Sequence, residues 1–333
     1  NNVQKDDTSN PNSMLLIIES LNLYLRTFAV NGMLNDRGVP IGGMMGFMKS
    51  LAYAIRETNP TRLMVIYDGA GGSQRRRKLA PSYKGNRKPG KRITRWDAFK
   101  NVEEEKQAMK IQFSRLLEYL DTLPINVISI DRIEADDTIA YVTNNLLEDE
   151  VIIMSADQDF LQLVNERVTV WSPIKKIFYT PEKVLEDYGV PAHNFLMYKI
   201  LMGDKSDNLE GVKGLGPKKL PKILPDISSN PLDLDFILDY ASKGTEPMHK
   251  KIVESIDQLT LNEKMMDLKN PPISGELKSL IRKLISQPIN LLSSNDFNTM
   301  YTDDQMGNAI DIPDIWLKQH FTRLNSYAKA THE

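Results

Sequence analysis

"MLLIIESLNLYLR", residues 14–26, decides the fold class of this chain. Five apolar residues, 14–18, are followed at once by the acid Glu19 and then by apolar residues at helical spacing. A short continuous apolar run is typical of a strand that is buried on both faces, as in parallel sheets. Because open parallel sheets bind ligands at the carboxyl ends of their strands, we interpret Glu19 as a candidate site residue at the end of a buried strand.

Similar apolar runs recur in the first half of the chain and alternate with longer segments of helical periodicity. The runs are "RLMVIY" (62–67), "INVISI" (125–130), "EVIIMS" (150–155) and "RVTVW" (167–171). This alternation predicts an α/β fold with a mostly parallel central sheet covered by helices. After about residue 182 the β-type runs stop and short helical patterns follow. We therefore expect a core over residues 14–182 and a helical subdomain with a C-terminal extension over residues 183–333.

The composition sets the class of protein. The 333 residues, 41% hydrophobic and 26% charged, suffice for a sizeable buried core. No apolar run approaches the roughly 18 residues of a membrane span, and residues 1–13 lack a signal-peptide core, so we expect a soluble chain with a flexible N-terminal tail. The chain has no cysteine, and its four histidines lack ligand spacing. Any metal ion must therefore be bound by oxygen atoms.

Acidic residues follow four of the predicted strands. Because the carboxyl ends of parallel strands meet at one edge of a sheet, we expect these acids to converge in one crevice. Each acid alone has another explanation, since Asp and Glu in a first helical turn cap the helix and favour its dipole. Together they would repel one another unless cations neutralise them, and Mg²⁺ or Mn²⁺ suit oxygen ligands. The acids are Glu19, Asp68, Glu134, Asp136, Asp137, Asp157 and Asp159, with a further pair, Asp204 and Asp207, at a predicted helix start.

A strongly basic segment lies near these acids in the sequence. Residues 72–96 carry ten Lys or Arg residues and no acid. One interpretation is a solvated basic loop. However, Tyr83 and Trp96 can stack on bases, and the glycines and prolines of "APSYKGNRKPGKR" argue against a simple charged helix, so we favour a nucleic-acid partner. The basic residues are Arg75, Arg76, Arg77, Lys78, Lys84, Arg87, Lys88, Lys91, Arg92 and Arg95.

The acids and the basic segment together predict a reaction type. Two divalent ions about 3.5–4 Å apart can generate hydroxide from water and stabilise the attacking and leaving oxygens at a phosphodiester. The adjacent basic segment would attract the polyanionic substrate. The sequence therefore predicts phosphodiester hydrolysis.

A glycine-rich stretch, "EGVKGLGPKK" (210–219), follows a helical pattern. Gly211, Gly214 and Gly216 permit positive φ angles and close backbone approach. A tight hairpin between two helices would present bare N–H groups, with Lys218 and Lys219, to a DNA phosphate. The alternative is a plain glycine turn, and the stretch does not match the dinucleotide-binding fingerprint. We predict a helix-hairpin-helix-like clamp at residues 211–219 that binds DNA without reading its sequence.

Five blocks of the sequence, in this order, resemble the bacteriophage and bacterial 5′-to-3′ exonuclease and flap endonuclease family. The blocks are "LLIIESLNLYLR", "IYDGAGGSQRRRKLAPSYKGNRK", "EADDTIA", "SADQDFLQLV" and "MGDKSDNLEGVKGLGPKK". The family includes the phage nuclease called RNase H and the 5′ nuclease domain of bacterial DNA polymerase I. The resemblance covers about residues 14–225 and implies a PIN-like 5′ nuclease core with a helical arch.

The resemblance also implies roles for individual residues. The acids that match Glu19, Asp68, Glu134 and Asp136 surround one metal ion, those that match Asp157, Asp159 and Asp207 surround a second, and Asp137 and Asp204 lie in or near the shared shell. Lys84 would contact the scissile phosphate, with Tyr83, Arg87 and Arg76 beside it. Residues of about 84–112 would form an arch through which a single-stranded 5′ end passes. The implied DNA-binding residues are Arg75, Arg77, Lys88, Lys91, Arg92, Gly214, Gly216, Lys218 and Lys219.

Cofactors and partners follow from the same resemblance. It implies two Mg²⁺ ions, replaceable by Mn²⁺, and a K⁺ ion at the glycine hairpin. The implied substrates are DNA with a 5′ flap, a nick or a single-stranded 5′ end, and RNA–DNA hybrids. We expect a monomer without membrane contact that meets a single-strand-binding protein or other replisome components, in the cytoplasm of a bacterial host cell if a phage encodes it.

Two functions remain open at this point. The first is a metal-dependent 5′ nuclease that removes RNA primers or DNA flaps during replication and repair. The second is a branched-DNA-binding protein with weakened catalysis, because Glu19 stands where the family places aspartate. One added methylene moves the carboxylate by about a bond length, which matters for an ion with strict octahedral demands. Retention of all the other acids favours the first function.

Overall fold

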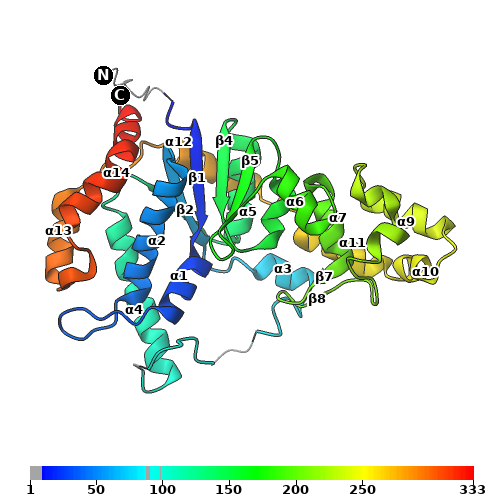
Figure 1. Cartoon of the computed structure of the whole chain (residues 1–333), viewed down its shortest axis with the longest axis horizontal. Helices are drawn as coiled ribbons and strands as arrows, with labels where there is room; N and C mark the ends of the chain where they lie inside the picture. Colours follow the sequence, from blue (N-terminus) through cyan, green and yellow to red (C-terminus); the bar gives the residue numbers. More distant parts are fainter. Residues whose placement is uncertain (1–9, 88–90, 98) are drawn as a thin grey trace.

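A six-stranded sheet forms the centre of the computed structural model, which describes residues 10–87, 91–97 and 99–333 (Figure 1). Its strand order is β3-β2-β1-β4-β5-β6, and β1 to β5 run parallel whereas β6 is antiparallel to β5. The predicted fold class, α/β with a mostly parallel sheet, is confirmed. The strands are β1 (Met14–Glu19), β2 (Arg62–Asp68), β3 (Asn126–Ile130), β4 (Glu150–Met154), β5 (Val168–Ser172) and β6 (Ile177–Tyr179), with a separate pair, β7 (Gly203–Asp204) and β8 (Leu209–Glu210).

The opening stretch forms the central strand β1 and the helix that follows it. Residues 15–18 are 0% exposed because both faces of the sheet are covered. Leu15 and Ile17 point into one hydrophobic core, whereas Leu16 and Ile18 point into the other. Burial of each such side chain contributes about 1.5–3 kcal/mol to the free energy of folding. Because β1 places side chains in both cores, it connects them. Its last residue, Glu19, lies at the carboxyl edge of the sheet, beside Ile66 of β2.

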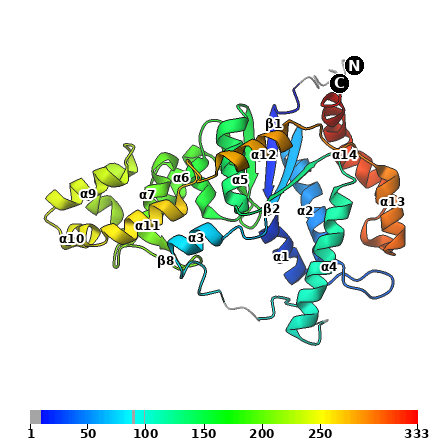
Figure 2. The same ribbon diagram turned by 180° about the vertical axis from the view of Figure 1, so that it is seen from behind.

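Helices cover both faces of the sheet (Figures 1 and 2). One core is shared with α1, α2, α4, α13 and α14, and the other with α5 to α12. The helices are α1 (Ser20–Val30), α2 (Gly42–Thr58), α3 (Gln74–Leu79), α4 (Val102–Leu120), α5 (Ala135–Tyr141), α6 (Pro181–Tyr188), α7 (Phe195–Met202), α8 (Leu220–Ile223), α9 (Leu234–Lys243), α10 (Pro247–Glu254), α11 (Ile256–Met266), α12 (Gly275–Ser286), α13 (Ser294–Asp303) and α14 (Pro313–Ala330), with short 3₁₀ or π segments at η1 (Val142–Leu146), η2 (Gln158–Leu163), η3 (Ala192–Asn194), η4 (Pro225–Ser228) and η5 (Gly307–Ala309). No described helix is both long and apolar enough to cross a membrane.

The C-terminal half differs from the expected single helical subdomain. Helices α9 and α10 project away from the sheet, but α12 contacts β3, and α14 contacts α2 and β2 (Figures 1 and 2). Arg115 of α4 forms an ion pair of 2.8 Å with Asp304, just after α13. Residues 275–333 therefore belong to the core around the sheet, because their apolar faces complete its two hydrophobic layers.

The described part of the predicted N-terminal tail, residues 10–13, is held by side-chain contacts. Residues 1–9 lie outside the described residues. The Asn10 side chain donates a hydrogen bond of 3.0 Å to Asp149, and Asn12 accepts one of 2.8 Å from the buried Arg62. Side-chain contacts thus fix residues 10–13 to the amino edge of the sheet.

The predicted helical arch, about residues 84–112, is helical from Val102 on, and its earlier described part is irregular. Residues 80–101, which we call the strap, contain no helix in their described part, and Lys88 and the other residues of 88–90 and 98 lie outside it. Helix α4 begins only at Val102, after Asn101, whose side chain accepts a hydrogen bond from the Glu104 backbone. The carboxylate of Glu105 accepts hydrogen bonds from the backbone of Ile93 and from Thr94, which ties the strap to α4. In Figures 1 and 2 the described parts of the strap lie below the carboxyl ends of the strands.

Candidate active site

The acids gather at the carboxyl edge of the sheet. The strand order reverses between β1 and β4, and such a switch point is where open α/β sheets form a binding crevice. Glu19 ends β1 on one side of this point, and Asp157 follows β4 on the other. The order of strands, rather than any single motif, thus brings these two carboxylates together.

Five acids form what we call the first cluster: Glu19, Asp68, Glu134, Asp136 and Asp157. Asp68 ends β2, and its side chain accepts a hydrogen bond of 2.7 Å from the Ala135 backbone at the start of α5. This contact holds the first turn of α5, which carries Asp136, against the end of β2. On the other side, the Ser155 hydroxyl donates a hydrogen bond of 3.0 Å to Glu19.

The first cluster is short of positive charge. Burial, and then the charge of Asp157, raises the pKa of Glu19 to about 7. The pKa of Asp136 is raised well above its ordinary value by burial and by Asp157 and Glu19. Carboxyl groups that repel one another in this way are stabilised in their charged form by a bound cation.

Asp159, Asp204 and Asp207 form the second cluster. One oxygen of each lies within 4.8 Å of the others, and among the described residues no other acids or histidines meet this condition. Burial, and then the charge of Asp204, raises the pKa of Asp207 to about 6. Burial opposes ionisation of Asp204 as well, but hydrogen bonds from Ser206 and Lys199 outweigh it and lower the pKa of Asp204.

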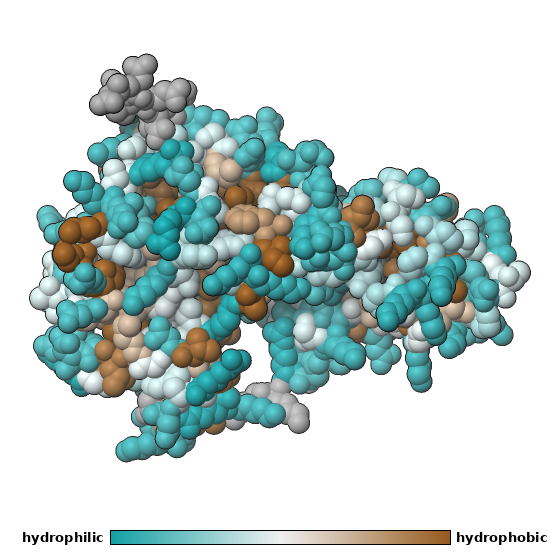
Figure 3. Space-filling view, viewed as in Figure 1, coloured by the Kyte–Doolittle hydropathy of each residue, from teal (hydrophilic) through white to brown (hydrophobic). Residues whose placement is uncertain are grey.

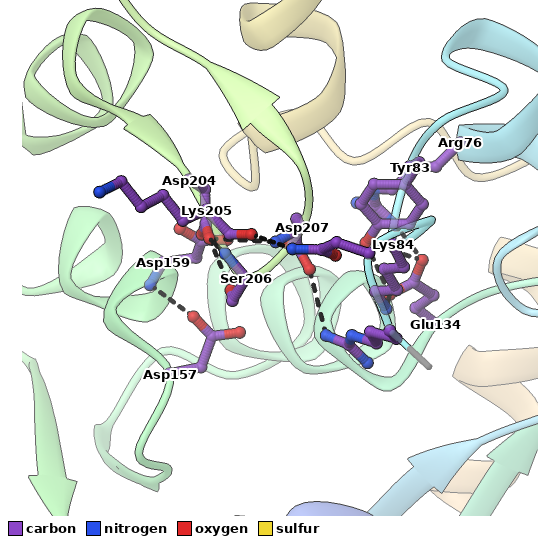
Figure 4. Close-up of polar contacts among 12 residues, drawn as sticks. Arg76, Tyr83, Lys84, Glu134, Asp157, Asp159, Asp204, Lys205, Ser206 and Asp207 are labelled. Carbon is purple, nitrogen blue, oxygen red and sulfur yellow. Dashed lines mark hydrogen bonds and ion pairs between the residues drawn. The ribbon is translucent and has the colours of Figure 1, made fainter. Parts of the chain in front are cut away.

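Asp157 and Asp159 serve different clusters although they are two residues apart. The chain is not extended here: Asp157 caps η2 and accepts a hydrogen bond of 2.9 Å from the Asp159 backbone. The turn separates the two side chains, as Figure 4 shows. Asp157 lies between the clusters, because its charge acts on Glu19 and Asp136 and also on Asp159 and Asp207. Asp159 faces Asp204 and Asp207.

The donor set fits hard divalent cations. Both clusters offer carboxylate oxygens, the ligands that Mg²⁺ and Mn²⁺ prefer. The buried Oδ1 atom of Asp159 has no hydrogen-bond partner and lies 3.6 Å from the Lys199 ammonium, so its surroundings suit a positive charge. Asp159, Asp204 and Asp207 are close enough together to hold one such ion.

Asp137 lies outside both clusters, which corrects its predicted place in the shared metal shell. Both of its oxygens accept hydrogen bonds of 2.7 Å from Arg76. Arg76 is 5% exposed, and it also donates to the Met265 carbonyl and lies 3.4 Å from Glu134. Glu134 and Asp137 do share one face of α5, as their spacing predicts, but that face meets a buried arginine. Arg76 therefore fixes α3 and α5 rather than facing a substrate.

The beginning of the strap, with Tyr83 and Lys84, lies beside Glu134 and Asp207 (Figure 4). Lys84 adopts a positive φ of 57°, and its backbone N–H donates a hydrogen bond of 2.9 Å to the Asp207 carbonyl. Its ammonium lies 3.1 Å from Glu134, whose carboxylate also accepts from the Tyr83 hydroxyl at 3.3 Å. Arg87 lies 3.2 Å from Asp207 and is largely exposed. Lys84 is thus held at the junction of the clusters by both its backbone and its side chain.

The glycine hairpin follows α7, β7 and β8 and precedes the short helix α8, so a small two-stranded turn stands between the predicted helix and the hairpin. Gly214 has a φ of +84°, and a Cβ atom on Gly211 would lie 2.3 Å from the Leu201 carbonyl oxygen. Gly216 has neither a positive φ nor a close neighbour, so the structure gives no reason for glycine there. Lys218 and Lys219 are exposed beside this turn.

Comparison with known proteins agrees with this geometry. A family model described as "5′-3′ exonuclease, N-terminal resolvase-like domain" matches residues 14–189, more than half of the chain. The chain belongs to this 5′-3′ exonuclease family. The 5′-3′ exonuclease of Bacillus subtilis (strain 168) is 29% identical over 283 residues, which cover 81% of this chain and 88% of that protein.

One relative is a much larger protein, and one solved structure of similar size shares the fold. The thermostable DNA polymerase I of Thermus thermophilus is 32% identical over 256 residues, which cover 76% of this chain but 28% of the polymerase. A crystal structure of the phage T5 flap endonuclease with DNA and metal ions has the same fold, with a TM-score of 0.62, 20% identity and coverage of 87% of this chain and 97% of that one.

One site residue of this exonuclease-family chain escaped sequence reasoning. Lys199, on α7, lies 3.1 Å from Asp204 and 3.6 Å from Asp159, with its side chain 10% exposed. Burial disfavours its charge, but the carboxylates of Asp159 and Asp204 outweigh burial and raise the pKa of Lys199. The signal was present in "FLMYKILM", where a single lysine interrupts an apolar helix. A buried lysine implies a buried anionic partner, which the sequence did not identify.

The remaining predicted DNA-binding residues of the family lie along α3 and the strap. Arg75 is half-buried, and Arg77, Lys91 and Arg92 are exposed. Arg92 pairs with Asp97 at 3.4 Å and lies 3.6 Å from Glu105, so part of its charge stabilises the strap itself. Arg77 and Lys91 keep their charges at the surface.

Proposed function

We propose that this protein is a structure-specific 5′ nuclease that hydrolyses phosphodiester bonds with two divalent cations. The observation that carries the proposal is the position of Lys84, at the junction of two acid clusters that suit hard cations. A phosphate between the clusters would meet a cation from the strap and a metal ion on each side. Family membership supports nuclease chemistry at this site.

Each residue would act through its position. Two bound cations would supply a hydroxide nucleophile and stabilise the charge that develops on the phosphate. Lys84 would add a fixed positive charge at the same phosphate, where it costs little reorganisation. Tyr83 and Lys84 both contact Glu134 and so hold this carboxylate in place. Arg87 would contact the next phosphate, because its exposed guanidinium lies beside Asp207.

The surrounding elements suggest the substrate. The strap crosses below the site, so a single-stranded 5′ end could pass between it and the sheet, while the glycine hairpin holds the duplex through backbone N–H groups, Lys218 and Lys219. We propose DNA with a 5′ flap or nick, and RNA primers on DNA, as substrates in replication and repair. A K⁺ ion at the hairpin carbonyls and contacts with a single-strand-binding protein or the replisome belong to the same proposal.

A metal titration tests this function. Flap, nicked and RNA-primed duplexes with a labelled 5′ end should be cleaved with Mg²⁺ or Mn²⁺ and not with EDTA. The double substitution Asp204→Asn and Asp207→Asn should abolish cleavage, whereas Asp311→Asn, an exposed acid far from the site, should not. Absence of products with either metal while DNA binding persists would contradict the proposal.

That negative result would favour the second candidate, a branched-DNA-binding protein with weakened catalysis. One observation supports it: the raised pKa of Glu19, about 7, leaves this carboxyl partly protonated at neutral pH. Glu19→Asp, which shortens the side chain by one methylene, should then increase cleavage at fixed Mg²⁺. Equal rates across the titration would remove this argument.

A further inference from the structure

A groove of about 420 Å³ lies between α1, α2 and the β5 edge of the sheet, outside both acid clusters. Its floor consists of buried apolar side chains, among them Met154 and Trp171. The Trp171 ring lies 5.7 Å from the Tyr53 ring and stacks on Phe178, which is 40% exposed. Figure 3 views this side of the molecule and shows apolar side chains gathered near β4 and β5 among polar ones. Trp171 itself is buried and Phe178 does not line the groove, so the accessible surface consists of apolar side chains such as Val30 and of the half-buried Tyr53 ring.

The charged residues of this groove are all basic. Arg26, Lys49 and Lys176 line it together with the apolar residues, and no acid does. Lys49 and Lys176 are exposed, and none of the three forms an ion pair with the part of the chain that the structure describes. A groove with this charge is complementary to an anion.

The groove is continuous with the active site. Helix α1 starts directly after Glu19, and Arg26 lies two turns further on. Burial lowers the pKa of Arg26, and the negative charge of Glu19 acts in the opposite direction, so the two side chains lie near each other. Met154 is the last residue of β4 and pairs with Ile18 and Trp171, so the groove opens at the same edge of the sheet as the acids. The glycine hairpin lies on the opposite face, where Val212 and Leu215 join the other core.

We propose that this groove binds an unpaired nucleic-acid strand of the substrate next to the cleaved junction; the proposal rests on the nuclease function proposed above. Apolar and aromatic surface for bases, flanked by cations for phosphates, is how proteins bind single strands without reading their sequence. A duplex keeps its bases stacked inside and would leave the apolar floor uncovered. The hairpin and the groove would thus hold the substrate on opposite sides of the acids, one by its duplex and one by an unpaired arm.

Binding measurements in EDTA test the groove without cleavage. The substrates are a nicked duplex and the same duplex with a single-stranded 5′ or 3′ arm at the nick. In the natural protein an arm should strengthen binding, and the double variant Lys49→Ala and Lys176→Ala should lose that gain while it binds the nicked duplex as before. For the armed DNA, the slope of log K against log salt should become shallower by about 1.4, the value for two phosphate contacts on a single strand. The arm whose gain is lost identifies the bound strand.

Two controls make the result specific. Arg282→Ala with Lys283→Ala removes two exposed charges from α12, and it should leave the gain from the arm unchanged. Ser50→Trp fills the groove without a change of charge, and it should reduce the gain as the double alanine variant does. The proposal would be overturned by equal weakening of both substrates, by no gain from either arm, or by a gain that survives both groove variants. In the last case an acidic protein segment would be the alternative occupant of the groove.

The outcome is separable from that of the nuclease proposal. Suppose that the protein cleaves nothing with Mg²⁺ or Mn²⁺ but that its arm-dependent binding disappears in the groove variants. The proposal for the groove would then be supported and the proposed nuclease function rejected. Cleavage together with an unaffected gain from the arm would do the reverse.

Discussion

The two acid clusters lie side by side, yet they are built differently. The first takes its acids from the ends of β1, β2 and β4 and the first turn of α5, so the backbone of the sheet fixes them. The second joins Asp159 from η2 to Asp204 and Asp207 from the turn between β7 and β8, segments that meet only through packing of α7. One cluster is a property of the sheet, and the other is a property of tertiary contacts.

Their counter-charges differ in the same way. Lys84 and Arg76 contact the first cluster at Glu134, and their charges also act on Asp68 and Asp136. Burial and the neighbouring acids still raise the pKa values of Glu19 and Asp136. The second cluster contains a buried ammonium, Lys199, between Asp159 and Asp204. The second cluster therefore carries part of its neutralising charge within the fold.

The largest effect should come from Lys84, because it stands where the two clusters meet. Lys84→Ala should lower the single-turnover rate by about 100-fold or more, the usual effect of removing one preorganised donor from a transition state, with little change in DNA affinity. Lys218→Ala, in the glycine hairpin, should instead weaken duplex binding and leave the bound rate unchanged. The exposed Lys78→Ala is the matched control. The reverse pattern for Lys84 and Lys218 would contradict their assignments.

Lys199 tests whether the second cluster depends on its internal cation. Lys199→Met should destabilise the metal-free protein by about 3 kcal/mol or more, because removal of one partner leaves buried carboxylates without compensation. Mn²⁺ should restore the stability and should bind the variant more tightly than the natural protein. Denaturant unfolding with EDTA and with Mn²⁺, together with calorimetric titration of Mn²⁺, measures both effects. Lys199→Arg should behave as the natural protein does, and weaker Mn²⁺ binding by the methionine variant would make Lys199 a support for the metal rather than its competitor.

The smallest effect concerns pH and the first cluster. Since the folded-state pKa of Glu19 is raised to about 7 from 4.5, this carboxyl stabilises the metal-free fold below pH 4.5 and loses that contribution as the pH rises through 7. Metal binding should follow the opposite direction, with an affinity about tenfold lower at pH 6 than at pH 8, because the ionised fraction falls by about that factor. Mn²⁺ titrations at both pH values check this. Glu19→Gln should remove most of the pH dependence, and an unchanged profile in that variant would assign it to another acid.

The sequence contained much of the first cluster because sheets obey a simple rule. Apolar runs that end in Glu19 and Asp68 already imply parallel strands with acids at their carboxyl ends, and the parallel sheet puts those ends at one edge. The sequence could not separate Asp136 from Asp137, since both fit a first helical turn. That choice depends on Arg76, whose guanidinium binds both oxygens of Asp137.

Long-range packing accounts for what sequence reasoning missed. Helices α12 to α14 were predicted to belong to the helical subdomain, because the apolar face of a helix does not show which surface it covers. The strap was expected to be helical, but its backbone is held instead by Glu105, and no local pattern shows such a distant hydrogen-bond partner. Lys199 was visible only as a lysine in an apolar helix.

By itself, the sequence determined the α/β class, the buried central strand with its terminal glutamate, and the acids and basic segment that mark a nuclease. Those features follow from local periodicity and from chemistry that each residue carries with it. The tertiary structure alone decided that Asp159, Asp204 and Asp207 meet around Lys199, that Asp137 belongs to Arg76, and that a basic groove continues from Glu19. Charges distant in sequence acquire partners only when the folded chain removes them from water together, and that pairing depends on packing rather than on sequence spacing.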